Sequence, residues 1–468
     1  MPSTASGSAS PQRVVVLADS DTRWKWGALT ARRLAPGARI DGMLLRGRAT
    51  PTPRQLAEVG VRADSLREVT GAGFVRAVTG ESGDSADPGA AADSASASSG
   101  SCDLVVLACV GGAVQAMLHG LARATGAVGA QGSGAGRPVV VTGYVGVVYE
   151  KLADGLLLRH GADVVLANSR YDAERFRSVY EGVGADASAV TECALPFLGG
   201  APYQGPSPER PFTVTFAAQP SVPASRGDRS YLLRRAVQHA RLHPEREVLI
   251  KLRSKPGEHT THIEEQPYQK LAAKLPGGLP PNCRLVYGHM GEVLDRTDLL
   301  VTVSSTAALE SLHRSVPTAL LTDLGVREVL GNHYFLGSGC LASWDSLDAG
   351  HLPDADPEWT SRQGVCAASS DAYESAFAGA RERVAGLAAK RGELPPIAPY
   401  YTPATAPGYL PGILARYGFD RDGAPLPGAP AEAGEPSLLR NALRNTARAA
   451  YRHGVQRVAP VIRRVGEL

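Results

Sequence analysis

Short runs of aliphatic and β-branched residues recur along the chain, separated by segments of helix length. In the first half we expect strands at residues 14–18, 104–108, 139–141 and 164–167, and helices at 113–125 and 171–180. Uninterrupted apolar runs are typical of strands that are buried on both faces of a parallel sheet. The alternation of strands with helices therefore predicts βαβ units.

The same pattern restarts after a Gly/Pro-rich linker at residues 199–211. Here we expect strands at residues 212–217, 248–252, 285–287, 299–303 and 318–322, and helices at 229–242, 306–313 and 371–390. We therefore predict an α/β protein with two Rossmann-like domains that face a cleft, at residues 13–198 and 212–390. Because ligands of open α/β sheets bind beyond the carboxyl ends of the strands, residues that follow strands are the first candidates for a site.

Besides the linker, five segments fall outside these domains or interrupt them. Residues 1–12 form a polar leader. Residues 81–101 and 126–137 are rich in small residues and bury too little apolar surface to offset ordering, so we expect flexible insertions. Residues 391–436 are Pro-rich, and residues 437–468 are expected to form a basic helix that Ser437 caps.

The expected C-terminal helix carries arginines at four-residue spacing, Arg440, Arg444, Arg448 and Arg452. A basic amphipathic helix can lie on an anionic membrane surface, and a solvated helix is the alternative.

Composition narrows the classes of partner and compartment. The 468 residues carry a net charge of only +3, which does not indicate nucleic acid as a partner. The six cysteines form no Cys-x-x-Cys pair, so we expect reduced thiols. The sequence has no signal-peptide pattern and no apolar run of about 18 residues. We therefore expect a cytoplasmic protein, and membrane binding by residues 437–468 would place it at the inner face of the membrane.

The first candidate motif follows the first expected strand and reads Asp-Ser-Asp-Thr-Arg-Trp-Lys-Trp-Gly from residue 19. A carboxylate at a strand end can act as a general base, which makes Asp19 and Asp21 candidates. Arg23, Trp24 and Trp26 are candidate acceptor-binding residues, because aromatic rings offer stacking faces. The alternative is a helix N-terminus that an aspartate caps, with both tryptophans in the core.

The second motif combines a strand end with three consecutive hydroxyl residues, Ser304, Ser305 and Thr306. Free backbone N–H groups, the helix dipole and hydroxyls together favour an anion at such a place, so we predict phosphate binding. Glu310 lies one turn later and is included in this site. Ordinary helix capping by Ser304 or Ser305 is the alternative.

Three further strand ends carry polar residues. Gln219 lies in a polar loop after the first strand of the second half, and Lys251 and Arg253 follow the next strand. The two cations are predicted to hold a nucleotide phosphate, with a solvated basic turn as the alternative. His289 follows a third strand and is either a donor-site residue or a hydrogen-bonded structural histidine.

Two aspartates precede the hydroxyl motif, Asp295 and Asp298. A helix end and a strand start explain them better than a metal pair does. We therefore expect no metal site and no cofactor.

The segment Asp-Leu-Leu-Val-Thr-Val-Ser-Ser-Thr-Ala-Ala-Leu-Glu, residues 298–310, followed by Val316-Pro317-Thr318, resembles the double-serine motif of bacterial capsule, sialyl- and polysialyltransferases and of glycerophosphate-polymer synthases. These enzymes are GT-B glycosyltransferases with two Rossmann-like domains, and their serines hold the phosphate of the donor nucleotide. Residues 13 to 390 also resemble an actinobacterial group of glycosyltransferases that share the motif at residue 19. Those transferases often carry Lys-x-His-Pro where this chain has Lys251-Leu252-Arg253-Ser254, so Arg253 is expected to replace the histidine.

The resemblance implies transfer of a sugar from a nucleotide-activated donor to a cell-surface glycan or a lipid-linked precursor, without a metal and with inversion. The second domain would bind the donor and the first domain the acceptor. Three alternatives stay open, namely a sugar-nucleotide epimerase, a polyol-phosphate transferase and a non-catalytic binding protein of polysaccharide assembly.

Overall fold

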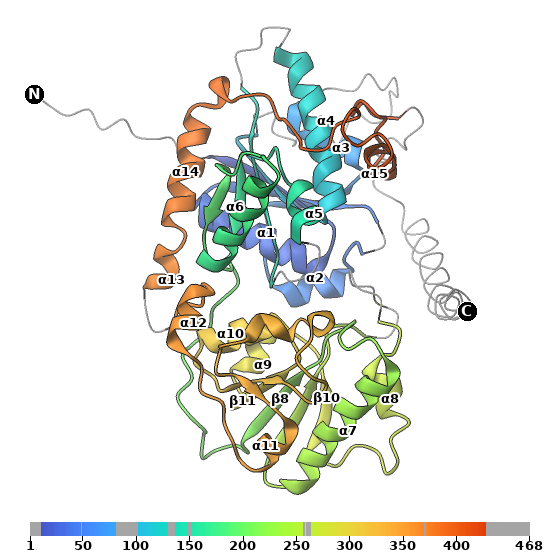
Figure 1. The fold of residues 1–468 in the computed structure, drawn as a ribbon, viewed down its shortest axis with the longest axis vertical. Helices are drawn as coiled ribbons and strands as arrows, with labels where there is room; N and C mark the ends of the chain where they lie inside the picture. Colours follow the sequence, from blue (N-terminus) through green and yellow to red (C-terminus); the bar gives the residue numbers. More distant parts are fainter. Residues whose placement is uncertain are drawn as a thin grey trace, which may run out of the picture. The chain divides into compact units, whose positions relative to one another are not determined.

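The computed structural model describes residues 11–47, 49–80, 102–129, 136–147, 152–255, 258, 264–368 and 371–426. These residues divide into two compact units. Unit 1 contains the described residues up to Leu198 and those from 360 to 426, and unit 2 contains those from Gly199 to Trp359 (Figure 1). The expected insertion at 81–101 and the basic helix at 437–468 lie outside the described residues.

The sheet of unit 1 is parallel throughout. Its seven described strands have the order β3-β2-β1-β4-β5-β6-β7. They are β1 (Arg13–Ala18), β2 (Arg39–Leu45), β3 (Ser65–Val69), β4 (Leu104–Ala108), β5 (Val139–Gly143), β6 (Val164–Ala167) and β7 (Val190–Glu192). The four predicted strands are β1, β4, β5 and β6, and nearly every residue in them is buried, as expected for strands covered on both faces.

Strands β2 and β3 were not predicted, because polar residues interrupt their apolar pattern. Asp41 lies within β2 at 5% exposure, where Arg13 Nε donates to its Oδ2 over 2.8 Å and Ser65 Oγ to its Oδ1 over 2.7 Å. A carboxylate that is satisfied in this way can occupy a buried strand position.

The helices of unit 1 connect successive strands. Those before residue 198 are α1 (Asp21–Leu34), α2 (Pro53–Val59), α3 (Gly71–Thr79), α4 (Gly111–Gly129), α5 (Leu152–Leu157) and α6 (Arg170–Gly182). Helix α4 extends into the segment 126–137 that we expected to be an insertion. Side chains of Ser20 and Ser169 accept from backbone N–H groups and fix where α1 and α6 begin.

Unit 2 repeats the architecture with six described parallel strands in the order β10-β9-β8-β11-β12-β13. They are β8 (Thr213–Ala217), β9 (Glu247–Lys251), β10 (Cys283–Val286), β11 (Leu299–Thr302), β12 (Thr318–Leu321) and β13 (Leu341–Ala342). The helices are α7 (Arg226–Leu242), α8 (Tyr268–Ala272), α9 (Met290–Leu294), α10 (Ala307–His313), α11 (Trp344–Asp348) and α12 (Pro357–Arg362), the last of which spans the boundary with unit 1. The predicted α/β class with two Rossmann-like units is confirmed.

The chain after Trp359 returns to unit 1, which corrects the prediction that residues 212–390 form one domain. This return contains α13 (Ala372–Ser375), α14 (Ala378–Ala389) and α15 (Leu410–Arg416). Arg33 of α1 pairs with Glu374, and Phe419 is fully buried in the core of unit 1. The described part of the Pro-rich segment is therefore a structural component of unit 1, because its apolar side chains complete that core.

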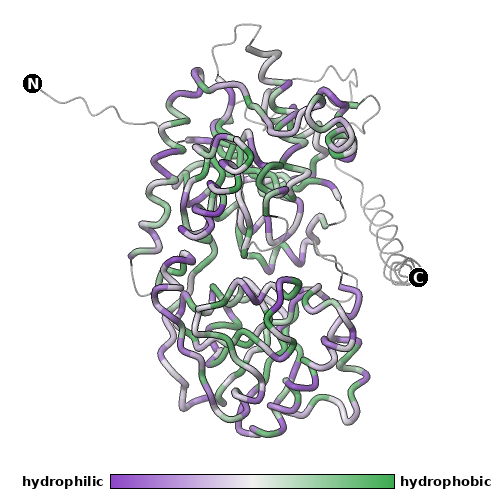
Figure 2. Tube along the Cα trace, viewed as in Figure 1, coloured by the Kyte–Doolittle hydropathy of each residue, from purple (hydrophilic) through white to green (hydrophobic). Residues whose placement is uncertain are grey.

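Each unit has its own hydrophobic core along its sheet. Figure 2 shows the hydrophobic positions concentrated inside each unit. Within the described ranges, no helix has both the length and the apolar character needed to span a bilayer.

Candidate functional site

The carboxyl edge of the unit 2 sheet brings together the predicted donor residues. Neighbouring strands are in register at this edge, with Ala217 opposite both Lys251 and Thr302. The predicted residues follow these strand ends: Gln219 after β8, Lys251 and Arg253 at and after β9, His289 after β10, and Ser304, Ser305, Thr306 and Glu310 after β11. Lys251 is the last residue of β9, and the other seven lie on loops or in the first turn of a helix at the same edge of the sheet, where ligands of open α/β sheets bind.

Ser304 joins two of these loops. Its N–H donates to Gln219 Oε1 over 3.0 Å, and Gln219 Nε2 donates to its Oγ over 3.2 Å. The Ser304 hydroxyl donates in turn to the Leu330 carbonyl over 2.5 Å, and the residue is 3% exposed. This buried hydroxyl therefore fastens the loop after β8 to the loop after β11, and does not project from the edge as a phosphate ligand would.

Thr306 is the hydroxyl residue at this edge that remains available. Ser305 Oγ accepts from the N–H of Ala307 over 3.2 Å and so acts as a cap for α10. The N–H and the hydroxyl of Thr306 have no hydrogen-bond partner within the described part of the chain, and the residue is half-buried. Glu310, at 8% exposure, lies in the first turn of α10. Of the three predicted hydroxyls, Thr306 is therefore placed best to contact an anion.

Positive charge lies on the other side of the β8 loop. Lys251 Nζ donates to the Leu252 carbonyl over 2.8 Å, and Arg253 is half-buried two residues later. His289 directly precedes α9. A Cβ on Gly291 would lie 2.8 Å from Cε1 of His289 and 3.1 Å from Nη2 of Arg314. Arg314, just after α10, was not among the predicted residues; it donates to the carbonyls of Gly199 and Gly291 over 2.7 and 3.1 Å.

The two aspartates considered for a metal have structural partners. Asp298 is fully buried and accepts from Arg210 Nη2 over 2.9 Å and from the Thr213 N–H over 2.8 Å. Asp295 ends α9 and pairs with Arg314. A strand start and a helix end explain these residues, as expected.

The carboxyl edge of the unit 1 sheet holds the motif at residue 19. Asp19 Oδ1 accepts from Arg23 Nη1 over 3.0 Å, and its Oδ2 accepts from the Val110 N–H over 2.9 Å. Ser20, and neither aspartate, caps α1. Asp21 is the first residue of that helix and is half-buried. Asp21 Oδ1 accepts from the Thr22 hydroxyl over 3.4 Å, and both aspartates stay candidates for the proton acceptor.

The structure corrects the prediction that Trp24 and Trp26 bind the acceptor. Both side chains have 0% exposure. A Cβ on Gly42 would lie 2.6 Å from Trp24 Cη2, and a Cβ on Gly143 would lie 2.9 Å from Trp26 Cζ2, so both rings pack directly against strands. Neither ring presents a face on which a sugar could stack, because helix α1 places both against the sheet.

A buried cation lies beneath the same edge. The Arg159 guanidinium donates to the carbonyls of Gly143, Gly155 and Cys109 over 3.0, 2.7 and 3.2 Å, and it lies 4.1 Å from the ring centroid of Tyr144. Burial lowers the pKa of Arg159. Because this residue ties the ends of β4 and β5 together, it shapes the edge, although nothing in its local sequence indicated that role.

Tyr417 reaches this edge from the C-terminal return. A Cβ on Gly112, at the start of α4, would lie 4.0 Å from its Cε2. Burial, together with the negative charge of Asp19, raises the pKa of Tyr417 to about 12. Its hydroxyl therefore stays protonated at neutral pH and can donate to a ligand. Tyr417 was not predicted as a site residue, because its segment was expected to lie outside both domains.

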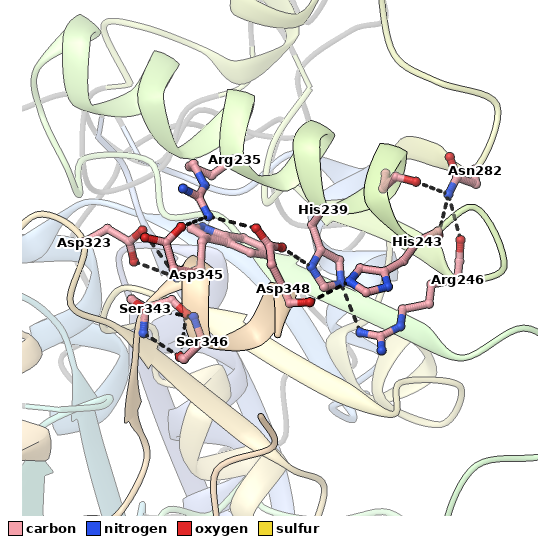
Figure 3. Close-up of polar contacts among 12 residues, drawn as sticks. Arg235, His239, His243, Arg246, Asn282, Asp323, Ser343, Asp345, Ser346 and Asp348 are labelled. Atoms are coloured by element: carbon pink, nitrogen blue, oxygen red, sulfur yellow. Dashed lines mark hydrogen bonds and ion pairs between the residues drawn. The ribbon is translucent and has the colours of Figure 1, made fainter. Parts of the chain in front are cut away.

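A separate polar network joins α7 to α11 in unit 2 (Figure 3). The side-chain ligand atoms of His239, His243 and Asp348 lie within 4.8 Å of one another, a spacing that suits a metal ion. However, Arg246 Nη1 lies 3.4 Å from His239 Nε2, and Asp348 Oδ1 lies 2.7 Å from His239 Nδ1. Because arginine only donates, Nε2 accepts and Nδ1 carries the proton, so the lone pair of His239 faces Arg246 and not a metal position.

This network predicts a pH effect on stability. Burial lowers the pKa of His239 below its ordinary value of 6.5, so protonation favours the unfolded chain. Neutral His239 therefore contributes its full share to the stability of the folded protein above about pH 6.5, and this contribution is lost as the pH falls below that value. When the pH is lowered from about 7.5 to about 5.5, the free energy of unfolding should therefore decrease less in His239→Asn than in the wild type. His351→Asn is the matched control, because His351 is exposed. If the free energy of unfolding depends on pH equally in His239→Asn and His351→Asn, buried His239 is not the source of the effect.

Comparisons with solved structures give matches at low sequence identity. MnaA of S. aureus, in a co-structure with UDP, is 12% identical, covers 78% of this chain and 94% of its own, and has a TM-score of 0.46. The glycosyltransferase SnogD from Streptomyces nogalater is 15% identical, covers 82% of this chain and 98% of its own, and has a TM-score of 0.36. No curated protein matches the sequence significantly.

A family model gives a match over residues 14–379, which are most of both units. The chain therefore belongs to the family described as "Putative glycosyltransferase (DUF6716)".

Proposed function

We propose that this protein transfers a sugar from a nucleotide-activated donor to a hydroxyl of a cell-surface glycan or a lipid-linked precursor. The observation that supports this most is the carboxyl edge of the unit 2 sheet. There the N–H and hydroxyl of Thr306, for which the described residues offer no hydrogen-bond partner, follow β11, and the cations Lys251 and Arg253 lie at and after the end of β9. These two strands flank β8. Hydroxyl, amide and cationic groups on strand-end loops suit the phosphates of a nucleotide.

The proposed reaction is a single displacement. The acceptor oxygen forms a bond to the anomeric carbon while the bond from that carbon to the phosphate oxygen breaks, and its electron pair leaves with the nucleotide. Asp21 takes the proton of the acceptor hydroxyl, and Asp19 holds Arg23 beside it. The fixed charges of Lys251 and Arg253 and the dipole at Thr306 stabilise the departing phosphate. Such a displacement inverts the anomeric centre.

Thr306→Val tests the donor site directly. Removing the hydroxyl should weaken nucleotide binding about tenfold, since a hydrogen bond to a charged group contributes about 1.5–3 kcal/mol. Thr322→Val is the matched control, because Thr322 follows β12 at the same edge but donates to the Ala342 carbonyl. Titration calorimetry with UDP-, CMP- and CDP-linked sugars gives the dissociation constants.

The same titration decides between the proposed function and its alternatives. If the wild type binds none of these nucleotides, the proposal is refuted. If it binds one and converts the sugar without any acceptor, product analysis will identify an epimerase. Binding without turnover in the presence of glycan acceptors would indicate a binding protein.

A further inference from the structure

Arg229 is a buried arginine near the start of α7, with 1% exposure. Its Nη1 donates to the carbonyls of Gln219, Pro220 and Pro223 over 2.9, 3.1 and 3.3 Å, and its Nε donates to the carbonyl of Gln266 over 2.7 Å. Three of these bonds fix the course of the loop 219–223 against helix α7, and the fourth holds the segment before α8 at Gln266.

A counterion and an aromatic ring complete the surroundings of this guanidinium. Its Nη2 donates to Glu264 Oε1 over 2.5 Å, and its Cζ lies 4.2 Å from the ring centroid of Tyr268. Burial raises the pKa of Glu264, and the charge of Arg229 opposes that rise. A planar fork of donors can serve all these partners at once, whereas the ammonium of lysine cannot.

The loop that Arg229 holds is the one that carries Gln219. The backbone of Gln219 accepts from Arg229, and its side-chain amide exchanges hydrogen bonds with Ser304. The order imposed by Arg229 therefore extends to the loop after β11, which continues to Thr306.

We propose that Arg229 is a positioning residue for the donor nucleotide, which it does not touch, and that it acts through Gln219 and Ser304 on the strand-end loops of unit 2. This inference rests on the proposed function, because it assumes that those loops bind a nucleotide. A simple structural clamp, which would affect stability alone, is the alternative.

The first experiment compares Arg229→Lys with Arg235→Lys. Arg235 lies on the same helix and pairs with Asp345 and Asp348 over 2.7 and 2.9 Å, outside the donor loops. Arg229→Lys should lose more thermal stability than Arg235→Lys, because Arg229 is the more deeply buried of the two and also donates to backbone carbonyls. Only Arg229→Lys should weaken UDP binding, by about tenfold, and speed hydrogen exchange at residues 218–224.

A second variant separates positioning from the cost of an unpaired charge. In Arg229→Met with Glu264→Met both charged groups are removed, which avoids a buried uncompensated carboxylate. We expect this double variant to fold with reduced stability, because the carbonyls that Arg229 served lose their donor, and to bind UDP about tenfold more weakly.

The outcomes distinguish this inference from the proposed function. If wild-type protein binds none of UDP and the CMP- and CDP-linked donors, the proposed function fails and this inference fails with it. If the wild type binds and Arg229→Lys matches Arg235→Lys in both affinity and exchange, only the inference fails. Wild-type affinity in the double variant would also overturn it, since the clamp would then serve stability alone.

Discussion

Asp21→Asn should lower kcat about a thousandfold and leave the dissociation constant of the donor within about twofold, because general-base catalysis contributes about 10²–10⁴. Asparagine keeps the shape of the side chain but cannot take a proton. Initial rates of nucleotide release, with a cell-envelope glycan fraction as acceptor, provide kcat. The loss should appear in kcat because Asp21 belongs to unit 1 and the proposed donor residues belong to unit 2.

Asp154→Asn is the matched control for Asp21→Asn. Asp154 lies in the first turn of α5, as Asp21 does in α1, and accepts from the hydroxyl of Tyr409 over 3.1 Å. This variant should keep its turnover. If Asp21→Asn retains wild-type turnover while Asp19→Asn loses it, the base is Asp19, in spite of its bonds to Arg23 and Val110.

Trp24→Ala should lower the free energy of unfolding by about 3–5 kcal/mol, as is typical when a buried aromatic residue is truncated. The indole is fully buried, and the close approach of Gly42 leaves little room for the cavity to collapse. Chemical denaturation followed by circular dichroism measures the change, which should appear in the transition of unit 1.

Trp359→Ala serves as the control for Trp24→Ala. Because Trp359 is half-buried, its truncation should lower the free energy of unfolding less. The two interpretations of Trp24 make opposite predictions. A core residue changes stability and leaves the acceptor KM of the folded protein unchanged. A small change in stability with a raised acceptor KM would restore the stacking role expected from the sequence.

The sequence predicted those parts of the fold that depend on local pattern. Runs such as Leu104–Ala108 and Val164–Ala167 are apolar throughout, so their strands were placed correctly. Strand β2 was missed because Asp41 looks like a loop residue until Arg13, 28 positions away, supplies its partner. Partners that are distant in sequence leave no local signal.

The candidate site shows the same limit. Strand-end position brought Gln219, Lys251 and Thr306 correctly to one edge of a sheet, because parallel strands end together. The exposure of single side chains was harder to predict. Trp24 has charged neighbours in the sequence, yet its indole faces the sheet. Arg229 was missed because its function depends on carbonyls of a loop that only the fold brings to it.

The return of the chain to unit 1 has a consequence for biosynthesis. Arg33 and Glu374 are 341 residues apart, and Phe419 belongs to the core that begins with β1. Unit 2 is contiguous from Gly199 to Trp359 in the described chain, so it can complete its core while unit 1 is still waiting for its last helices. Contacts of such long sequence separation form slowly. The nascent first unit thus leaves the ribosome with the site of α14 uncovered, and it reaches its final form only after the second unit has been made.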